Sequence, residues 1–146
     1  MPRKKKSAVK WISYYMQVVE YKLSYSFSWH EQSRFTTRGY SVLNHIEIEA
    51  RNLYPDESGI ESASVYIYGR DNELDDADES NGSVGSINKI RGEARIQVYT
   101  SIPGKSFVWL ASILKHNRPV YVNVDGPRQG RVHRMRHFSV THESPE

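Results

Sequence analysis

The sequence predicts a mainly β protein with one domain, built as an antiparallel β-sandwich or open barrel of six or seven strands with one short α-helix at about residues 105–116. Three observations predict this class. Apolar and polar residues alternate in six segments, which is the period of a half-buried strand. The helical period occurs only once, whereas a parallel sheet needs several crossover helices. The 146 residues are enough for one core and too few for two.

The N-terminal half contains three of the predicted strands. From residue 19 to residue 27 every second side chain is apolar or aromatic and the others are Glu, Lys or Ser, so this strand is expected to be half-buried. Residues 46–51 alternate in the same way and carry an ionic outer face. A third strand around residues 63–68 has aliphatic residues on one face and Tyr66 and Tyr68 on the other.

The C-terminal half contains a loop, the helix and the remaining strands. Residues 70–86 hold acidic and turn-forming residues with few apolar ones, so we expect an acidic mobile loop there. A strand at 94–99 precedes the helix at 105–116, whose apolar residues follow the spacing i, i+3, i+4, i+7. Residues 120–124 and 132–140 alternate again, and the glycine-rich turn between them predicts a hairpin.

Charge is clustered along the chain, although its net value is only +3. Residues 1–10 contain five basic residues and no acidic one, and are expected to form a basic flexible tail. Six carboxylates lie between Asp71 and Glu79. Residues 11–142 are expected to form the single β-rich domain, followed by a short tail at 143–146.

Several classes of protein are disfavoured by what the sequence lacks. Cysteine is absent, which excludes disulfides and a cysteine nucleophile. No apolar run approaches the roughly 20 residues of a membrane span, so we expect no membrane association. A cytoplasmic location follows by elimination, or a nuclear one if the source is eukaryotic.

No motif in the sequence points to catalysis, a cofactor or a metal. Phosphate-loop and dinucleotide-binding patterns are missing, and Ser83 lacks the strand-to-helix context of a catalytic serine. His133 and His137 are four residues apart, which on a strand separates their Cα atoms by about 13 Å, too far to share a zinc ion. We therefore expect no enzyme activity, no cofactor and no metal site.

The last predicted strand is unusual because arginines fall on a face expected to be apolar. Burying unpaired guanidinium groups costs several kcal/mol, so carboxylate partners, a bulge or a position beyond the core must accommodate them. Arginine also binds phosphate and carboxylate groups through two parallel hydrogen bonds. The candidate polyanion-binding residues are Arg128, Arg131, Arg134 and Arg136, together with Lys4, Lys5 and Lys6 of the tail.

Tyrosines lie opposite the aliphatic faces of several strands, where they could stack on bases or sugars. The favoured alternative is that these rings lie under the helix, as a second covered face. The stacking candidates are Tyr66, Tyr68, Tyr99 and Tyr121. Trp11, Trp29 and Trp109 are expected to anchor the core or a lid.

Together these patterns favour a non-catalytic binding module that contacts a polyanion, with nucleic acid as the favoured partner. The C-terminal hairpin and the N-terminal tail would make the contacts. The alternative is a protein-interaction or assembly subunit, such as a homo-oligomer, in which acidic and basic surfaces of different copies meet. A third alternative is a carbohydrate-binding domain that uses the tyrosine face.

Overall fold

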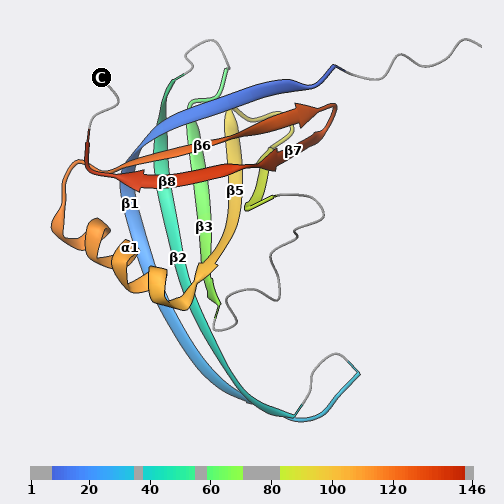
Figure 1. Ribbon diagram of the computed structural model, residues 1–146, viewed down its shortest axis with the longest axis vertical. Helices are drawn as coiled ribbons and strands as arrows, with labels where there is room; N and C mark the ends of the chain where they lie inside the picture. The colour runs from blue at the N-terminus through green and yellow to red at the C-terminus, as the bar shows by residue number, and fades with distance from the viewer. Residues whose placement is uncertain (1–7, 35–37, 55–58, 71–82, 144–146) are drawn as a thin grey trace, which may run out of the picture.

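The structure is a computed structural model that describes residues 8–34, 38–54, 59–70 and 83–143. It is mainly β with one helix, which confirms the predicted class (Figure 1). The strands form one sheet that curls into a ring, because β1 pairs with β2 on one edge and with β6 on the other. Within the described ranges, no helix has the length and apolar character needed to cross a membrane.

The elements and their order define the ring. Along the chain they are β1 (Lys10–His30), β2 (Gly39–Tyr54), β3 (Ser62–Arg70), β4 (Gly85–Lys89), β5 (Arg95–Pro103), α1 (Gly104–His116), β6 (Tyr121–Gln129), β7 (Val132–Met135) and β8 (His137–Thr141). Around the sheet the order is β1-β2-β3-β5-β4-β7-β6-β8, and the β1–β6 pairing closes it. All pairs are antiparallel except β3 with β5.

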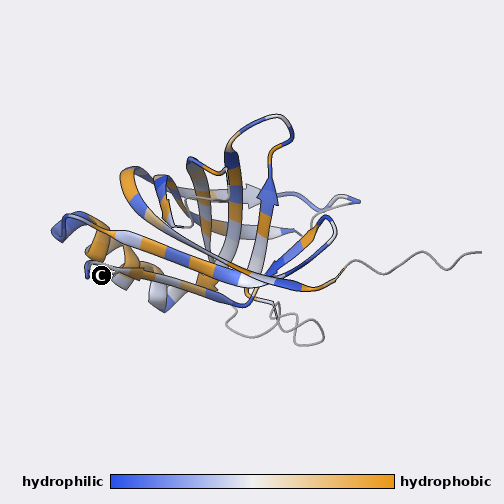
Figure 2. Cartoon of the chain, turned by 90° about the horizontal axis from the view of Figure 1, so that it is seen from above, coloured by the Kyte–Doolittle hydropathy of each residue, from blue (hydrophilic) through white to orange (hydrophobic). Residues whose placement is uncertain are grey.

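The core fills the inside of this ring. Alternation along each strand points aliphatic side chains inward, among them Ile48, Val65 and Val98, all with no exposed surface. The same alternation of hydrophobic and hydrophilic residues is visible along the strands in Figure 2. The aliphatic side chains of the ring therefore form one continuous core.

Helix α1 closes one end of the ring. Its buried residues Leu110 and Leu114 belong to the same core cluster as the inward strand residues. Phe107 packs on the inner face of β3, where a Cβ at Gly69 would lie 3.1 Å from its ring. The helix bounds agree with the predicted 105–116, and Lys115 and His116 complement the helix dipole at its C-terminus.

Strand β1 continues well beyond the ring, so one expectation about its burial is wrong. A bulge between Val18 and Glu20 shifts the register against β2, so that odd-numbered residues face inward beyond it. Tyr21 is packed against the core, but Leu23, Tyr25 and Phe27 are exposed although their pattern predicts burial. The hairpin of β1 and β2 extends past the end of the barrel (Figure 1).

The predicted last strand is divided into β7 and β8 at Arg136. The backbone N–H of Arg136 donates to the carbonyl oxygen of Asp125 at 2.8 Å, while both neighbouring segments pair with β6. Odd-numbered residues such as Met135 face inward in β7, and this irregularity makes even-numbered residues such as Phe138 face inward in β8. Arg134 therefore does not share a buried face with Phe138, and the predicted conflict is resolved by a bulge.

The structure also differs from the sequence predictions in one additional strand and in the exposure of the tryptophans. Strand β4 was not predicted and pairs with β5 and β7. With β4 and the division of the last predicted strand, the described strands number eight. Trp11, Trp29 and Trp109 are exposed, so they do not anchor the core, which was one of the two roles expected of them. Most of the predicted acidic loop, residues 71–82, and most of the two predicted tails lie outside the described residues.

The burial of His133 predicts how stability depends on pH. Burial is the main cause that lowers its pKa below the ordinary 6.5, and the Arg128 charge adds to this, while hydrogen bonds to the Gly126 and Ile12 backbone act in the opposite direction. The unfolded chain thus binds more protons below pH 6.5. The stabilisation from neutral His133 is fully present above pH 6.5 and is lost as the pH falls from there toward the lowered pKa.

We therefore expect the free energy of unfolding, measured in urea, to fall between pH 7.5 and 5.5, and to fall less in His133→Gln. His142 is exposed, so His142→Gln serves as the matched control and should keep the wild-type slope. Equal slopes in the wild type and His133→Gln would contradict the assignment.

Candidate functional site

Four rings form a continuous row on the outer surface of β2, β3 and β5, and we call His45, Tyr66, Tyr68 and Tyr99 the aromatic row. Tyr66 stacks on Tyr99 with ring centroids 5.0 Å apart and an interplanar angle of 15°. His45 stacks on Tyr68 at 4.8 Å and 17°, and lies 6.1 Å from Tyr66 with the rings nearly parallel. Three neighbouring strands thus present one stacked surface.

Strand register builds this row. Tyr66 lies directly opposite Tyr99 in the parallel β3–β5 pair, and His45 lies opposite Tyr68 in the antiparallel β2–β3 pair. Side chains opposite each other on one face of a sheet are close enough for rings to touch. Because the intervening residues, such as Ile67, point into the core, the rings must point outward.

The aromatic row is accessible from outside the barrel. Tyr99 is 36% exposed, and Tyr66 and Tyr68 are half-buried. Helix α1 packs at the inner side of the barrel end, so the expectation that the tyrosines lie beneath it is wrong (Figure 1). The Tyr99 hydroxyl donates to Gln97 Oε1 at 3.2 Å, and one face of the Tyr99 ring packs on Tyr66.

His45 was not among the predicted site residues. It shares its outer face with Glu47 and Glu49, and this alternation is the signal that could have placed it there. Its Nε2 atom is buried and has no hydrogen-bond partner among the described residues. A buried ring nitrogen without a partner is rare in proteins.

Tyr121 lies apart from the aromatic row. It is on β6, where its ring centroid lies 6.5 Å from that of Tyr15 at an interplanar angle of 53°. No ring contact among the described residues links this pair to Tyr66 or Tyr99. The structure therefore brings together three of the four predicted stacking candidates.

Tyr66 and Tyr99 also belong to a line of outward-facing residues that crosses the strands and ends at a cationic residue. Following the register across the strands, Glu47 lies opposite Tyr66, Tyr66 opposite Tyr99, Tyr99 opposite Ser86, and Ser86 opposite Arg134. Arg134 is exposed and its Cα lies two strands from Tyr99, about 10 Å along the sheet. This line therefore runs from the Glu47 carboxylate on β2 to the Arg134 guanidinium group on β7.

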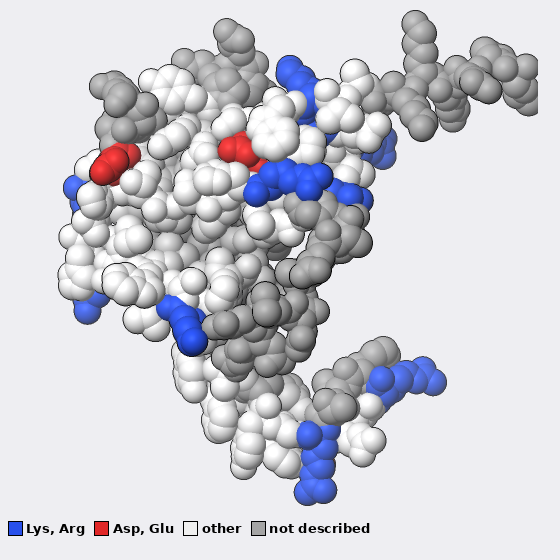
Figure 3. Space-filling view, in the orientation of Figure 1, with Lys and Arg blue, Asp and Glu red and all other residues white. Residues whose placement is uncertain are grey.

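The other predicted arginines lie around β7. Arg131 is exposed in the turn between β6 and β7, and Arg136 is exposed at the bulge. Arg128 is half-buried, and its Nε donates to the carbonyl oxygen of Gly130 at 3.1 Å. Figure 3 shows basic side chains gathered over β7. Lys4, Lys5 and Lys6 lie outside the described residues.

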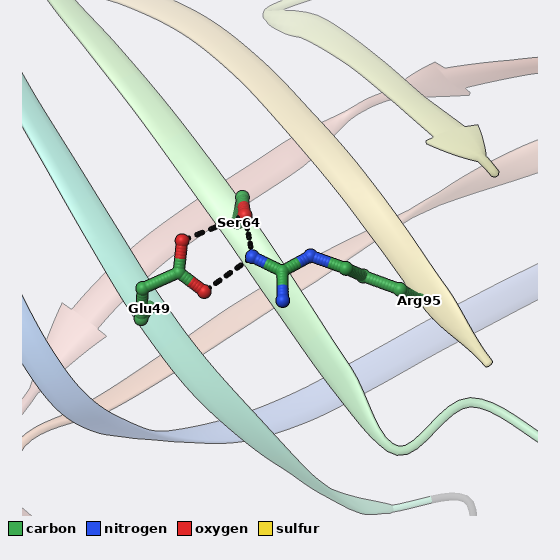
Figure 4. Close-up of polar contacts among 3 residues, drawn as sticks. All are labelled: Glu49, Ser64 and Arg95. Atoms are coloured by element: carbon green, nitrogen blue, oxygen red, sulfur yellow. Dashed lines mark hydrogen bonds and ion pairs between the residues drawn. The ribbon is translucent and has the colours of Figure 1, made fainter. Parts of the chain in front are cut away.

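A polar cluster flanks the aromatic row at the next position of the same strands. Arg95 forms an ion pair with Glu49 and contacts Ser64 Oγ, which donates to Glu49 Oε1 at 2.8 Å (Figure 4). Both charged side chains are about one-third exposed. Since the pair neutralises Glu49, it removes one negative charge that would repel an anion beside the tyrosines.

No family model, no curated protein and no solved structure matches the chain. Among the residues that the structure describes, no group of three His, Asp or Glu side chains is placed to hold a metal ion. The chemistry of the site therefore has to be inferred from its own rings and charges.

At Gly126 the backbone of β6 lies so close to the segment Arg134–Arg136 that there is no room for a Cβ atom. A Cβ at this buried position would overlap the carbonyl oxygen of Arg134 and lie 3.1 Å from the backbone nitrogen of Arg136. We expect Gly126→Ala to lower the free energy of unfolding by about 1–3 kcal/mol, because the backbone that carries Arg134 has to move. Urea denaturation measures this change.

Ser112→Ala, at an exposed helix position, is the control and should stay within about 0.5 kcal/mol of the wild type. A Gly126→Ala variant as stable as this control would contradict the close approach of the two strands.

Proposed function

We propose that the chain binds single-stranded nucleic acid across the aromatic row, with Arg134 and its basic neighbours contacting phosphates. The observation that carries this proposal is the register that places Tyr66, Tyr99 and Arg134 in one line on the outer surface of the barrel. Aromatic side chains stack on bases, and a basic groove that follows the backbone provides the remaining affinity.

The charges at the two ends of this line determine on which side of the bound strand its sugar–phosphate backbone lies. Glu47, beside Tyr66, repels phosphates, whereas Arg134 attracts them. Bases are therefore expected over Tyr66 and Tyr99, with the sugar–phosphate backbone toward β4 and β7. Lys4, Lys5 and Lys6 would add attraction that does not depend on base sequence.

The ligand class follows from what each part of the site can recognise. In a duplex the faces of the bases are covered by the neighbouring base pairs, so stacking on an aromatic ring favours a single strand over a duplex. Neutral sugars also stack on tyrosine, but they gain no charge attraction from the arginines around β7. A polyanion with planar rings uses both parts of the site, so it fits better than a carbohydrate.

The path of the sheet supports this proposal by analogy. Strands β1-β2-β3-β5-β4, with β3 and β5 parallel, follow the order of an OB barrel, and β7 and β6 are inserted between β4 and β1. OB barrels bind oligonucleotides on the face of strands 2 and 3. That face of this chain carries His45, Tyr66 and Tyr68.

Removing a ring from the row tests the stacking contribution. We expect Tyr99→Ala to weaken binding of a labelled oligo(dT) by about 5- to 150-fold, since stacking on one aromatic side chain contributes about 1–3 kcal/mol per base. Fluorescence anisotropy at about 50 mM salt measures the change. Tyr99→Phe keeps the ring and should bind nearly as the wild type does.

Tyr121→Ala is the matched control, because it removes a tyrosine from a different part of the outer surface. It should leave the affinity within about twofold of the wild type. The proposal is wrong if Tyr99→Ala and Tyr121→Ala have equal effects, or if the wild type binds no oligonucleotide at low salt.

Charge substitutions at the two ends of the line test the phosphate contacts. Arg134→Gln should weaken binding. It should also make the slope of log K against log salt shallower by about 0.7, since one phosphate contact with a single strand is lost. Glu47→Gln should strengthen binding severalfold at low salt because it removes a repulsive charge. Titrations between about 50 and 200 mM salt separate the two effects. An unchanged salt slope in Arg134→Gln would remove this residue from the interface.

A further inference from the structure

The edge of β1 that pairs with β6 inside the barrel has no partner strand, among the described residues, where β1 leaves the barrel. One edge of β1 pairs with β2 as far as His30. The other edge pairs with β6 only as far as Gln17, followed by one hydrogen bond from Val18 N to the Val120 oxygen at 2.8 Å. Between Val19 and Trp29, no strand in the described part of the chain pairs with this edge.

The same hairpin carries an exposed apolar surface, the hairpin apolar face. Six of its side chains are 37% to 70% exposed, and they lie on the face that continues the inner surface of the barrel. They are Leu23, Tyr25, Phe27, Trp29, Tyr40 and Val42. Tyr40 stacks on Phe27 at 5.1 Å and meets the edge of Trp29 at 4.8 Å, so the rings form one cluster.

A two-stranded hairpin with such a face needs a partner. An isolated hairpin is marginally stable in water, and a long apolar strand with an open edge readily pairs with another chain. A large side chain has about 150–250 Å² of surface. At the exposed fractions given above, the six side chains together expose roughly 600 Å² per copy. This is at the upper end of what a monomer exposes and approaches the roughly 800 Å² per partner of a standard interface.

We propose that this edge and the hairpin apolar face form an interface with a second copy of the chain, through antiparallel pairing of the two β1 strands. A two-fold axis through a residue of β1 places residues of the same parity opposite each other. With the axis near Tyr25 or Ser26, apolar residues of one copy therefore meet apolar residues of the other. The only charged residues between Val19 and Trp29 are Glu20 and Lys22, and in either register neither faces its own counterpart.

Charge and position favour a protein over nucleic acid on this surface. None of the six side chains of the hairpin apolar face is charged, and the described cation that contacts one of them is Arg38, 5.5 Å from the Trp29 ring centroid. The aromatic row lies on the opposite face of β2, since His45 points outward where Ile46 points inward. A dimer built in this way leaves the outer faces of both barrels available.

Sedimentation equilibrium of the full chain, without nucleic acid, tests the interface from about 1 to 100 µM. We expect the mass to approach twice 16.9 kDa as concentration rises. The association should persist at about 500 mM salt because apolar contacts and backbone pairing drive it. A contact between acidic and basic surfaces would instead dissociate at that salt concentration.

Two lysine substitutions on the same strand separate the two faces. Tyr25→Lys places a charge on the hairpin apolar face and should raise the dimer dissociation constant at least tenfold. Ser24→Lys places the same charge on the other face and should leave it nearly unchanged. Circular dichroism checks that both variants are folded, which we expect because Tyr25 and Ser24 are exposed.

A wild type that stays monomeric at 100 µM would overturn the proposal, as would equal dissociation constants for the two variants. Loss of oligo(dT) binding by Tyr25→Lys in a monomeric protein would assign the surface to nucleic acid instead. Since the dimer is measured without oligonucleotide, failure of this inference can be told apart from failure of the nucleic-acid proposal.

Discussion

Closure of the barrel by β1 is the constraint on which the rest of the structure depends. The first part of this strand pairs with β2 on one edge and with β6 on the other, so the sheet has a definite inside and outside. Once aliphatic side chains fill the inside, every alternate residue must face solvent. The aromatic row is the part of that outer surface where β2, β3 and β5 carry rings at matching positions.

The bulges decide where this simple alternation changes. Near Val19 the bulge shifts the register of β1 as it leaves the barrel, and near Arg136 the irregularity separates β7 from β8. Each changes the face on which the following residues lie. The first continues the inner surface into an exposed hairpin, and the second places Arg134 on the outside. The two proposed interfaces therefore lie on opposite faces of the same curled sheet.

The sequence predicted what depends on local periodicity. Alternation revealed most strands, and the change of period located the helix within one residue of its start. It also placed Tyr66 and Tyr68 on one face of their strand, but not opposite Tyr99, since pairing register depends on contacts between distant segments. Strand β4 was missed because five residues with a single buried side chain give almost no periodic signal.

Burial was harder to predict than secondary structure. An alternating strand shows that one face is apolar but not whether anything covers it, and Leu23 to Trp29 are exposed for this reason. The arginines of the last strand conflicted with a regular alternation, and a bulge was one of the three arrangements that could accommodate them; the structure has the bulge. His45 was missed because a single histidine on a polar face has no distinctive spacing.

Binding of nucleic acid across the aromatic row is tested most directly by mapping the amide chemical-shift changes of the labelled protein during titration with an unlabelled single-stranded oligonucleotide at low salt. We expect the largest changes on β2, β3 and β5 around His45, Tyr66 and Tyr99, and along the line through Ser86 to Arg134. Changes confined to the first ten residues, or to the face of β6 that carries Tyr121, would contradict this expectation.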